Sequence, residues 1–241
     1  PNPRKVVHND HGVFTQLGDG EDRREEMKLL QEKSSIVAAE LKKMIEAKMG
    51  GRQQSAVQQG SSRRLSIDGD VAQALLDAHN TMRSDTAAGD TAGQPSATNM
   101  NKMNWDPALA TVAQNYADLC YYAHNPDRKT DFQAIADQAT FYYETPSSLS
   151  RGIGENIFAH SNKDIDFEEA ALYGMQLFFD EYEDYTYNDG SCSSVCGHYT
   201  QIVWATSRYV GCGIASCNSL GGISDSYVSN GGLFMVCNYF Q

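Results

Sequence analysis

The stretch Cys196-Gly197-His198-Tyr199-Thr200-Gln201-Ile202-Val203-Trp204 places an imidazole, a hydroxyl and a carboxamide beside an apolar Ile-Val-Trp run that we expect to be buried. Cysteines flank this stretch on both sides. A histidine held next to core residues is more often part of a site than a stray surface group. A structural histidine whose ring nitrogens are both hydrogen-bonded is the alternative. His198 is therefore the first candidate site residue.

The length of 241 residues allows one domain of ordinary size plus an extension. No apolar run approaches the roughly 20 residues that a membrane span needs. The chain begins with Pro1 and shows no signal-peptide pattern, so we expect a processed product whose targeting segment has been removed.

Charge is divided unevenly along the chain. Residues 1–69 carry 12 Lys/Arg and 10 Asp/Glu, a net of +2, whereas residues 70–241 carry 7 and 21, a net of −14. A domain this acidic repels nucleic acid and anionic lipid surfaces, so neither is an expected partner.

All six cysteines lie in the acidic part of the chain: Cys120, Cys192, Cys196, Cys212, Cys217 and Cys237. An even number clustered in this way favours disulfides and an oxidising, extracellular compartment. Zinc is the alternative, because two closely spaced cysteine pairs can imitate a four-cysteine site. The residues alone allow about 15 pairings of six cysteines.

The first 69 residues divide into an arm and a linker. Residues 1–20 show no hydrophobic period and are expected to be irregular, while Asp22 and Glu25 can form a capping box that begins a helix ending near Gly50. This amphipathic helix, residues 22–50, either folds against its own domain or attaches the chain to a protein partner. Residues 51–69, rich in Gln, Ser, Gly and Arg, are expected to form a flexible linker.

The remaining residues, 70–241, carry the pattern of a mixed domain. Helices are expected to begin at Asp70, at Asp106-Pro107 and at Asp166, each of which supplies an N-cap side chain. The inward faces expected for these three helices are Leu75, Ala78, His79 and Met82; Leu109, Val112, Ala113, Tyr116 and Cys120; and Phe167, Ala171, Met175, Phe178 and Tyr182. Residues 103–105, 209–215 and 233–239 favour strands, so the fold class is α+β.

Several motifs resemble the CAP superfamily of cysteine-rich secretory proteins, antigen 5 and pathogenesis-related class 1 proteins. In chain order they are His79-Asn80 with Arg83, Trp105-Asp106-Pro107-Ala108-Leu109-Ala110, Gly154-Glu155-Asn156-Ile157, the Gly197–Ser207 stretch, and Val236-Cys237-Asn238-Tyr239. The resemblance covers residues 70–241 and implies a three-layer α-β-α sandwich, the SCP domain. It also implies the disulfides Cys120–Cys217, Cys192–Cys196 and Cys212–Cys237.

The resemblance further implies a cavity lined by two histidines and two glutamates, which the motifs place at His79, Glu155, Glu181 and His198. Two neutral imidazoles, His79 and His198, suit zinc or another divalent cation with open coordination positions, and either glutamate could orient a ligand or take a proton from bound water. The alternative is two His–Glu hydrogen-bonded pairs that only stabilise the cavity wall. The other histidines, among them His124, are expected to be surface or loop groups.

Three functions remain open at this stage. The first is a secreted binding module for a sterol, another lipid or a protein, as in relatives, with no organic cofactor. The second is an assembly component docked through the helix at residues 22–50. The third is a weak metal-assisted hydrolase; we do not expect native catalysis, because no Gly-x-Ser-x-Gly or His-Glu-x-x-His motif occurs.

Overall fold

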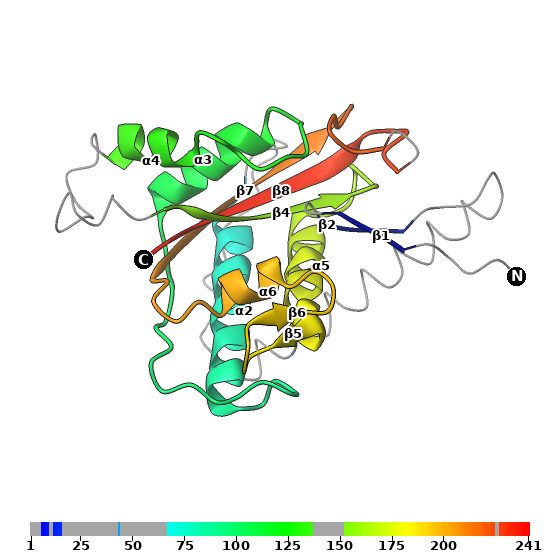
Figure 1. Ribbon diagram of the computed structural model, residues 1–241. Helices are drawn as coiled ribbons and strands as arrows, with labels where there is room; N and C mark the ends of the chain where they lie inside the picture. Colours follow the sequence, from blue (N-terminus) through cyan, green and yellow to red (C-terminus); the bar gives the residue numbers. More distant parts are fainter. Residues whose placement is uncertain (1–5, 10–11, 16–42, 44–66, 137–151, 225–226) are drawn as a thin grey trace, which may run out of the picture.

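The computed structural model describes residues 6–9, 12–15, 43, 67–136, 152–224 and 227–241 (Figure 1). Its centre is a four-stranded sheet in the order β3-β7-β8-β4. The strands are β3 (Asn104–Trp105), β4 (Gly154–His160), β7 (Tyr209–Cys217) and β8 (Gly232–Phe240). β7, β8 and β4 run antiparallel, while the short β3 lies parallel to the start of β7. β4 and β3 are therefore the two edges of the sheet.

Helices cover both faces of this sheet, which makes the α-β-α sandwich that the motifs implied (Figure 1). One face carries α2 (Gly69–Ala88), α5 (Phe167–Asp180) and the short α6 (Gly197–Ile202). The other carries α3 (Pro107–Ala117) and α4 (Arg128–Ala136).

The alternation of side chains along β8 divides the core between these layers. Met235 and Tyr239 pack in the cluster that contains α2 and α5. Phe234 and Val236 pack with α3 instead.

Two of the three expected helix starts are confirmed. Asp106 caps α3 by accepting from the main-chain N–H groups of Ala108 and Leu109, and Asp166 caps α5 in the same way. For α2 the expectation was wrong by two residues. Asp68, not Asp70, is extended and accepts from the N–H groups of Asp70 and Val71, so the helix begins at Gly69.

The N-terminal arm contains a feature that its composition did not indicate. β1 (Val6–Asn9) and β2 (Gly12–Thr15) form an antiparallel pair, although residues 1–20 were expected to be irregular. Val6, Val7 and Val13 have a high propensity for strands, but strands of four residues are too short to show a hydrophobic period. The helix expected at residues 22–50 lies outside the described residues apart from Lys43, which is helical, and so does most of the linker.

The structure pairs all six cysteines, which excludes a four-cysteine zinc site. The disulfides are Cys120–Cys217, Cys192–Cys196 and Cys212–Cys237, the pairing that the resemblance implied. The Cys120–Cys217 disulfide joins the loop after α3 to the end of β7, and the Cys212–Cys237 disulfide links β7 to β8. Cys120 itself does not extend the buried face of α3, because the helix ends at Ala117 and Cys120 adopts a φ of 52°.

A short excursion connects α5 to α6. It contains a 3-10 turn, η2 (Glu181–Asp184), and two short paired strands, β5 (Tyr185–Thr186) and β6 (Ser191–Cys192). The Cys192–Cys196 disulfide links this excursion to the residue before α6. Within the described part of the chain, no helix is both long and apolar enough to span a membrane.

Candidate functional site: two histidine–glutamate pairs and a groove

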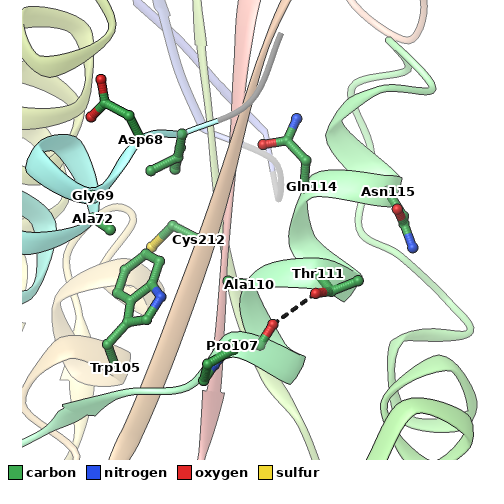
Figure 2. Close-up of a pocket in the computed structure, with 11 residues that line it drawn as sticks. Asp68, Gly69, Ala72, Trp105, Pro107, Ala110, Thr111, Gln114, Asn115 and Cys212 are labelled. Carbon is green, nitrogen blue, oxygen red and sulfur yellow. Dashed lines mark hydrogen bonds between the residues drawn. The ribbon is translucent and has the colours of Figure 1, made fainter. Parts of the chain in front are cut away.

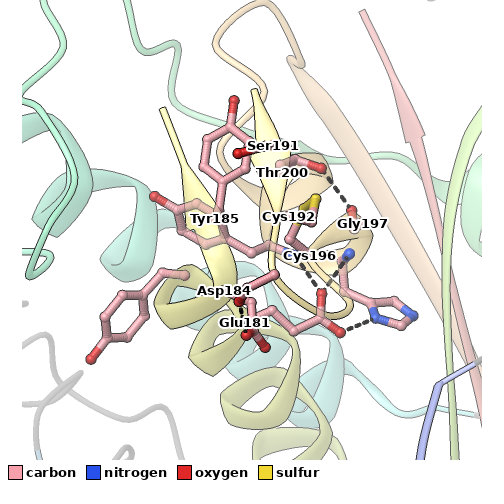
Figure 3. The surroundings of a disulfide bond; sticks show 12 residues. Glu181, Asp184, Tyr185, Ser191, Cys192, Cys196, Gly197 and Thr200 are labelled. Atoms are coloured by element: carbon pink, nitrogen blue, oxygen red, sulfur yellow. Dashed lines mark hydrogen bonds and ion pairs between the residues drawn. A yellow bond between two sulfur atoms is a disulfide. The ribbon is translucent and has the colours of Figure 1, made fainter. Parts of the chain in front are cut away.

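Glu181 and His198 form a buried pair at the junction of η2 and α6 (Figure 3). Oε1 of Glu181 lies 2.6 Å from Nδ1 of His198, and Oε2 accepts from the His198 main-chain N–H at 2.9 Å. The imidazole also stacks on Phe178, with ring centroids 4.5 Å apart. Since a carboxylate oxygen accepts, Nδ1 carries the proton and Nε2 is the nitrogen left to face a ligand.

Glu155 forms the second pair, and its partner is His124. Oε1 of Glu155 lies 2.7 Å from Nδ1 of His124 and accepts from the main-chain N–H of Asn125 at 2.9 Å. The Glu155 side chain is 1% exposed, whereas that of His124 is 37% exposed. The glutamate is thus an internal anchor for a histidine that reaches solvent.

His79 belongs to neither pair, which corrects the sequence-based assignment. Nδ1 donates to the carbonyl oxygen of Leu75 at 2.7 Å, and Nε2 accepts from the Tyr239 hydroxyl at 2.9 Å. Burial lowers the pKa of His79 to about 4, so the ring is neutral at pH 7. Both nitrogens are in use, and His79 is a core histidine. The spacing Cys120-x-x-x-His124 was the available signal for the actual partner of Glu155.

Asn156 nevertheless joins His79 indirectly to His198. Its Nδ2 lies 3.1 Å from the Tyr239 hydroxyl and donates to the His198 carbonyl oxygen at 3.1 Å. Glu155 and Asn156 are neighbours on the edge strand β4 and point to opposite faces of the sheet. The edge strand therefore anchors His124 on one face and the backbone of His198 on the other.

Close contact between α6 and β4 fixes this arrangement. A Cβ added at Gly154 would lie 2.1 Å from Oε1 of Gln201, so the carboxamide of the α6 residue occupies the space of a side chain there. A larger residue at 154 would first displace this carboxamide, which is the flexible end of the Gln201 side chain.

Arg83 holds the chain that follows α6. Its buried guanidinium donates to the carbonyl oxygens of Asn101, Ile202, Trp204, Ala205 and Ser207. Burial lowers the pKa of Arg83 to about 10, and the group stays protonated at pH 7. The carbonyls converge on Arg83 because the chain turns after Ile202, and this turn leaves Trp204 54% exposed. The expectation that the whole Ile-Val-Trp run is buried was therefore wrong, although Ile202 itself is buried.

The pair proposed for a metal, His79 and His198, does not fit one. A cation at His79 would have to break a buried hydrogen bond at one of its nitrogens. Among the residues that the structure describes, no group of three or more His, Cys, Asp and Glu side chains is placed to hold a metal ion. His198 differs from His79, because its Nδ1 is held by Glu181 and its Nε2 has the chemistry of a metal ligand.

A groove of about 410 Å³ lies at the opposite edge of the sheet, between the start of α2 and α3 (Figure 2). It exists because β3 covers only Tyr209 and Val210 of β7, so β7 continues without a neighbouring strand. The Gln114 carboxamide substitutes for that strand at one point, since it both donates to and accepts from the backbone of Ile214. The lining residues are Ile67, Asp68, Gly69, Ala72, Trp105, Pro107, Ala110, Thr111, Gln114, Asn115 and Cys212. This groove was not predicted from the sequence, and the short strand expected at residues 103–105 was the available signal for it.

The chain is similar in sequence to known proteins over more than half of its length. GLIPR1-like protein 1 from Homo sapiens is 34% identical over 164 residues, 68% of this chain and 55% of that protein. The Bos taurus protein of the same name is 37% identical over 145 residues, 60% of this chain and 51% of that protein. The chain thus spans about half the length of these relatives.

Solved structures agree on the fold. Schistosoma mansoni venom allergen-like protein 4 aligns with a TM-score of 0.51 and 25% identity, covering 71% of this chain and 88% of that one. Na-ASP-1 aligns with a TM-score of 0.54 and 24% identity, covering 79% and 43%. The sequence model of the Cysteine-rich secretory protein family, CAP, matches residues 76–239. The chain belongs to the CAP family of cysteine-rich secretory proteins.

Proposed function

We propose that this chain is a secreted binding module that holds a neutral sterol in the groove between α2 and α3. The observation that carries the proposal is the groove itself, whose volume of about 410 Å³ falls in the range of small-molecule sites, roughly 300–1,000 Å³. Secretion is supported by three disulfides, which persist in oxidising compartments.

The lining of the groove suits an amphipathic molecule with a large apolar body. Trp105, Pro107 and Ala110 offer apolar surface, while Asp68 and Gln114 place polar groups at its border (Figure 2). A sterol has this division, with rigid rings and a single hydroxyl. Its rigidity also lowers the entropy lost on binding.

Charge favours a neutral sterol over a fatty acid anion. The chain carries a formal net charge of −12 at pH 7, and Asp68 lies in the groove. An anionic head group would be repelled, whereas a hydroxyl can donate to a carboxylate.

Energy transfer from tryptophan to dehydroergosterol tests this proposal. The chain has only Trp105 and Trp204, so a Trp204→Phe background leaves a single donor in the groove. We expect saturable transfer with the sterol and little competition by palmitate. Ala110→Trp, in the wild-type background and assayed with radiolabelled sterol, should fill the groove and weaken binding by about tenfold or more.

The matched control is Ala134→Trp, on an exposed position of α4 away from the groove. It should bind sterol as the wild type does. Equal binding by the two alanine variants, or the absence of sterol binding in the wild type, would refute the proposed site. Tighter binding of palmitate than of sterol would refute the charge argument.

A second function, coordination of a divalent cation, is supported by the two carboxylate-anchored histidines. His124 and His198 each place Nδ1 on a glutamate, an arrangement that is common among metal-binding histidines. Because β4 is an edge strand that both pairs flank, one cation at this edge would be held by a nitrogen from each pair; it would keep water in its other positions and act there as a Lewis acid. Calorimetric titration with ZnCl₂ should show binding that either His124→Ala or His198→Ala abolishes. His160→Asn, whose imidazole instead contacts Asn162, should leave binding unchanged; loss of binding in that control, or its survival in both paired variants, would contradict the site.

A further inference from the structure

Glu155 and Asn238 lie directly opposite each other on the neighbouring strands β4 and β8. Asn238 is also opposite Gly211 on β7. A Cβ at Gly211 would meet the main-chain nitrogen of Ala110 in α3 at 2.2 Å, so this row of residues faces α3. The side chains of Glu155 and Asn238 are therefore side by side beneath that helix.

Both side chains are buried, and both have polar atoms without a partner in the described part of the chain. Asn238 is 0% exposed and the Glu155 side chain 1%. Oε2 of Glu155 and both Oδ1 and Nδ2 of Asn238 make no hydrogen bond to any residue that the structure describes. Leaving such groups unpaired destabilises the folded state, and proteins usually satisfy them with internal water.

We propose that Glu155 and Asn238 form an internal water site under α3, in which water donates to Glu155 Oε2 and Asn238 Oδ1 and accepts from Asn238 Nδ2. Register brings the two side chains within about 5 Å at Cβ, yet they make no direct hydrogen bond, which leaves a bridging molecule as the way to satisfy both. Water fits this site better than a cation for two reasons. The buried amide N–H of Asn238 would repel a cation, and the described residues offer no third metal ligand.

The site gives Asn238 a positioning role. Oε1 of Glu155 already accepts from His124 and Asn125, and water at Oε2 would hold the other half of the carboxylate. Asn238, through the water, thus sets the direction in which Glu155 presents His124. This role is independent of the groove and of sterol binding.

Water magnetic relaxation dispersion on the full chain counts long-lived internal water. We expect at least one such molecule to be lost in Asn238→Leu, while a crystal structure of the wild type shows water within hydrogen-bond distance of Glu155 Oε2 and Asn238. Asn238→Asp, close in shape, is the second variant in case leucine prevents folding, and it should retain water. An empty space or a bound cation between the two side chains in the wild type would overturn the proposal.

The change in Tm on replacing Asn238 with leucine distinguishes a site that holds water from one that does not. If water bridges the pair, Asn238→Leu strands Glu155 Oε2 and lowers Tm by several degrees, and it lowers Tm less in a Glu155→Leu background. If no water is bound, Asn238→Leu removes an unpaired amide and leaves Tm unchanged or raises it, which would exclude the site.

Discussion

Oε1 of Glu181 lies 2.6 Å from Nδ1 of His198, while Oε2 of the same carboxylate accepts from the main-chain N–H groups of His198 and Tyr199. One side chain therefore orients the imidazole and also satisfies the first N–H groups of α6. A carboxylate has no donor to present to these groups, so every contact at this junction is an accepted hydrogen bond.

Replacing Glu181 with Gln should destabilise the protein. The amide would turn an N–H either toward the α6 N–H groups, where only an acceptor fits, or toward Nδ1 of His198, which would then have to carry its proton on Nε2 instead. We expect a cost of about 1–3 kcal/mol. Urea denaturation of the full chain measures the difference in unfolding free energy. Glu183→Gln, at an exposed neighbouring position, is the control and should be close to neutral; equal losses in the two variants would contradict this account.

Acidification should weaken the fold through His79. Its pKa in the folded protein is about 4, below the 6.5 of an unperturbed histidine, so the unfolded chain binds more protons between these values. The free energy of unfolding is therefore unaffected by His79 above pH 6.5 and decreases as the pH falls toward 4. The total decrease due to His79 is about 3 kcal/mol.

Unfolding free energies measured from pH 4 to 7 test this effect in the wild type and in His79→Gln. The variant keeps hydrogen-bonding capacity but cannot take up the proton, so its stability should depend less on pH across this window. An identical slope in both proteins would show that other groups account for the acid sensitivity.

Arg83→Lys should be strongly destabilising although it keeps the charge. A guanidinium presents several donors in a fixed plane, and five carbonyl oxygens converge on it here. An ammonium cannot reach all of them, and we expect a loss of about 2–4 kcal/mol from the stranded buried carbonyls. Arg208→Lys at an exposed position is the control. A loss below about 0.5 kcal/mol in Arg83→Lys would mean that the carbonyls find other partners.

The disulfides should contribute unequally to stability. Cys120–Cys217 closes a separation of 97 residues and Cys192–Cys196 one of 4. Loop-closure entropy then gives about 5 kcal/mol for the first and about 2 kcal/mol for the second. Denaturation of the two double-alanine variants measures both losses, and a greater loss from Cys192/Cys196 would contradict the entropic account.

Local patterns predicted much of the fold correctly. The caps at Asp106 and Asp166 and the strands near residues 209–215 and 233–239 follow from residue types within a few positions of one another. The predictions failed where the local sequence allowed two conformations. Asp68 and Asp70 can each cap a helix, and only the backbone dihedral angles at Asp68 select it. Trp204 belongs to an apolar run, but Arg83 draws the backbone inward there and leaves the indole outside.

The sequence by itself determined the three long helices of the domain, the strands near residues 104–105, 209–215 and 233–239, and the disulfide framework. It also determined that Glu155, Glu181 and His198 lie next to buried structure. Each of these depends on neighbouring residues or on a family motif. Only the tertiary structure decided that His124, and not His79, meets Glu155, and that β3 ends soon enough to open a groove. The sheet brings together segments 31 residues apart at Glu155 and His124. Hydrogen bonds between such segments depend on packing geometry, which no local pattern encodes.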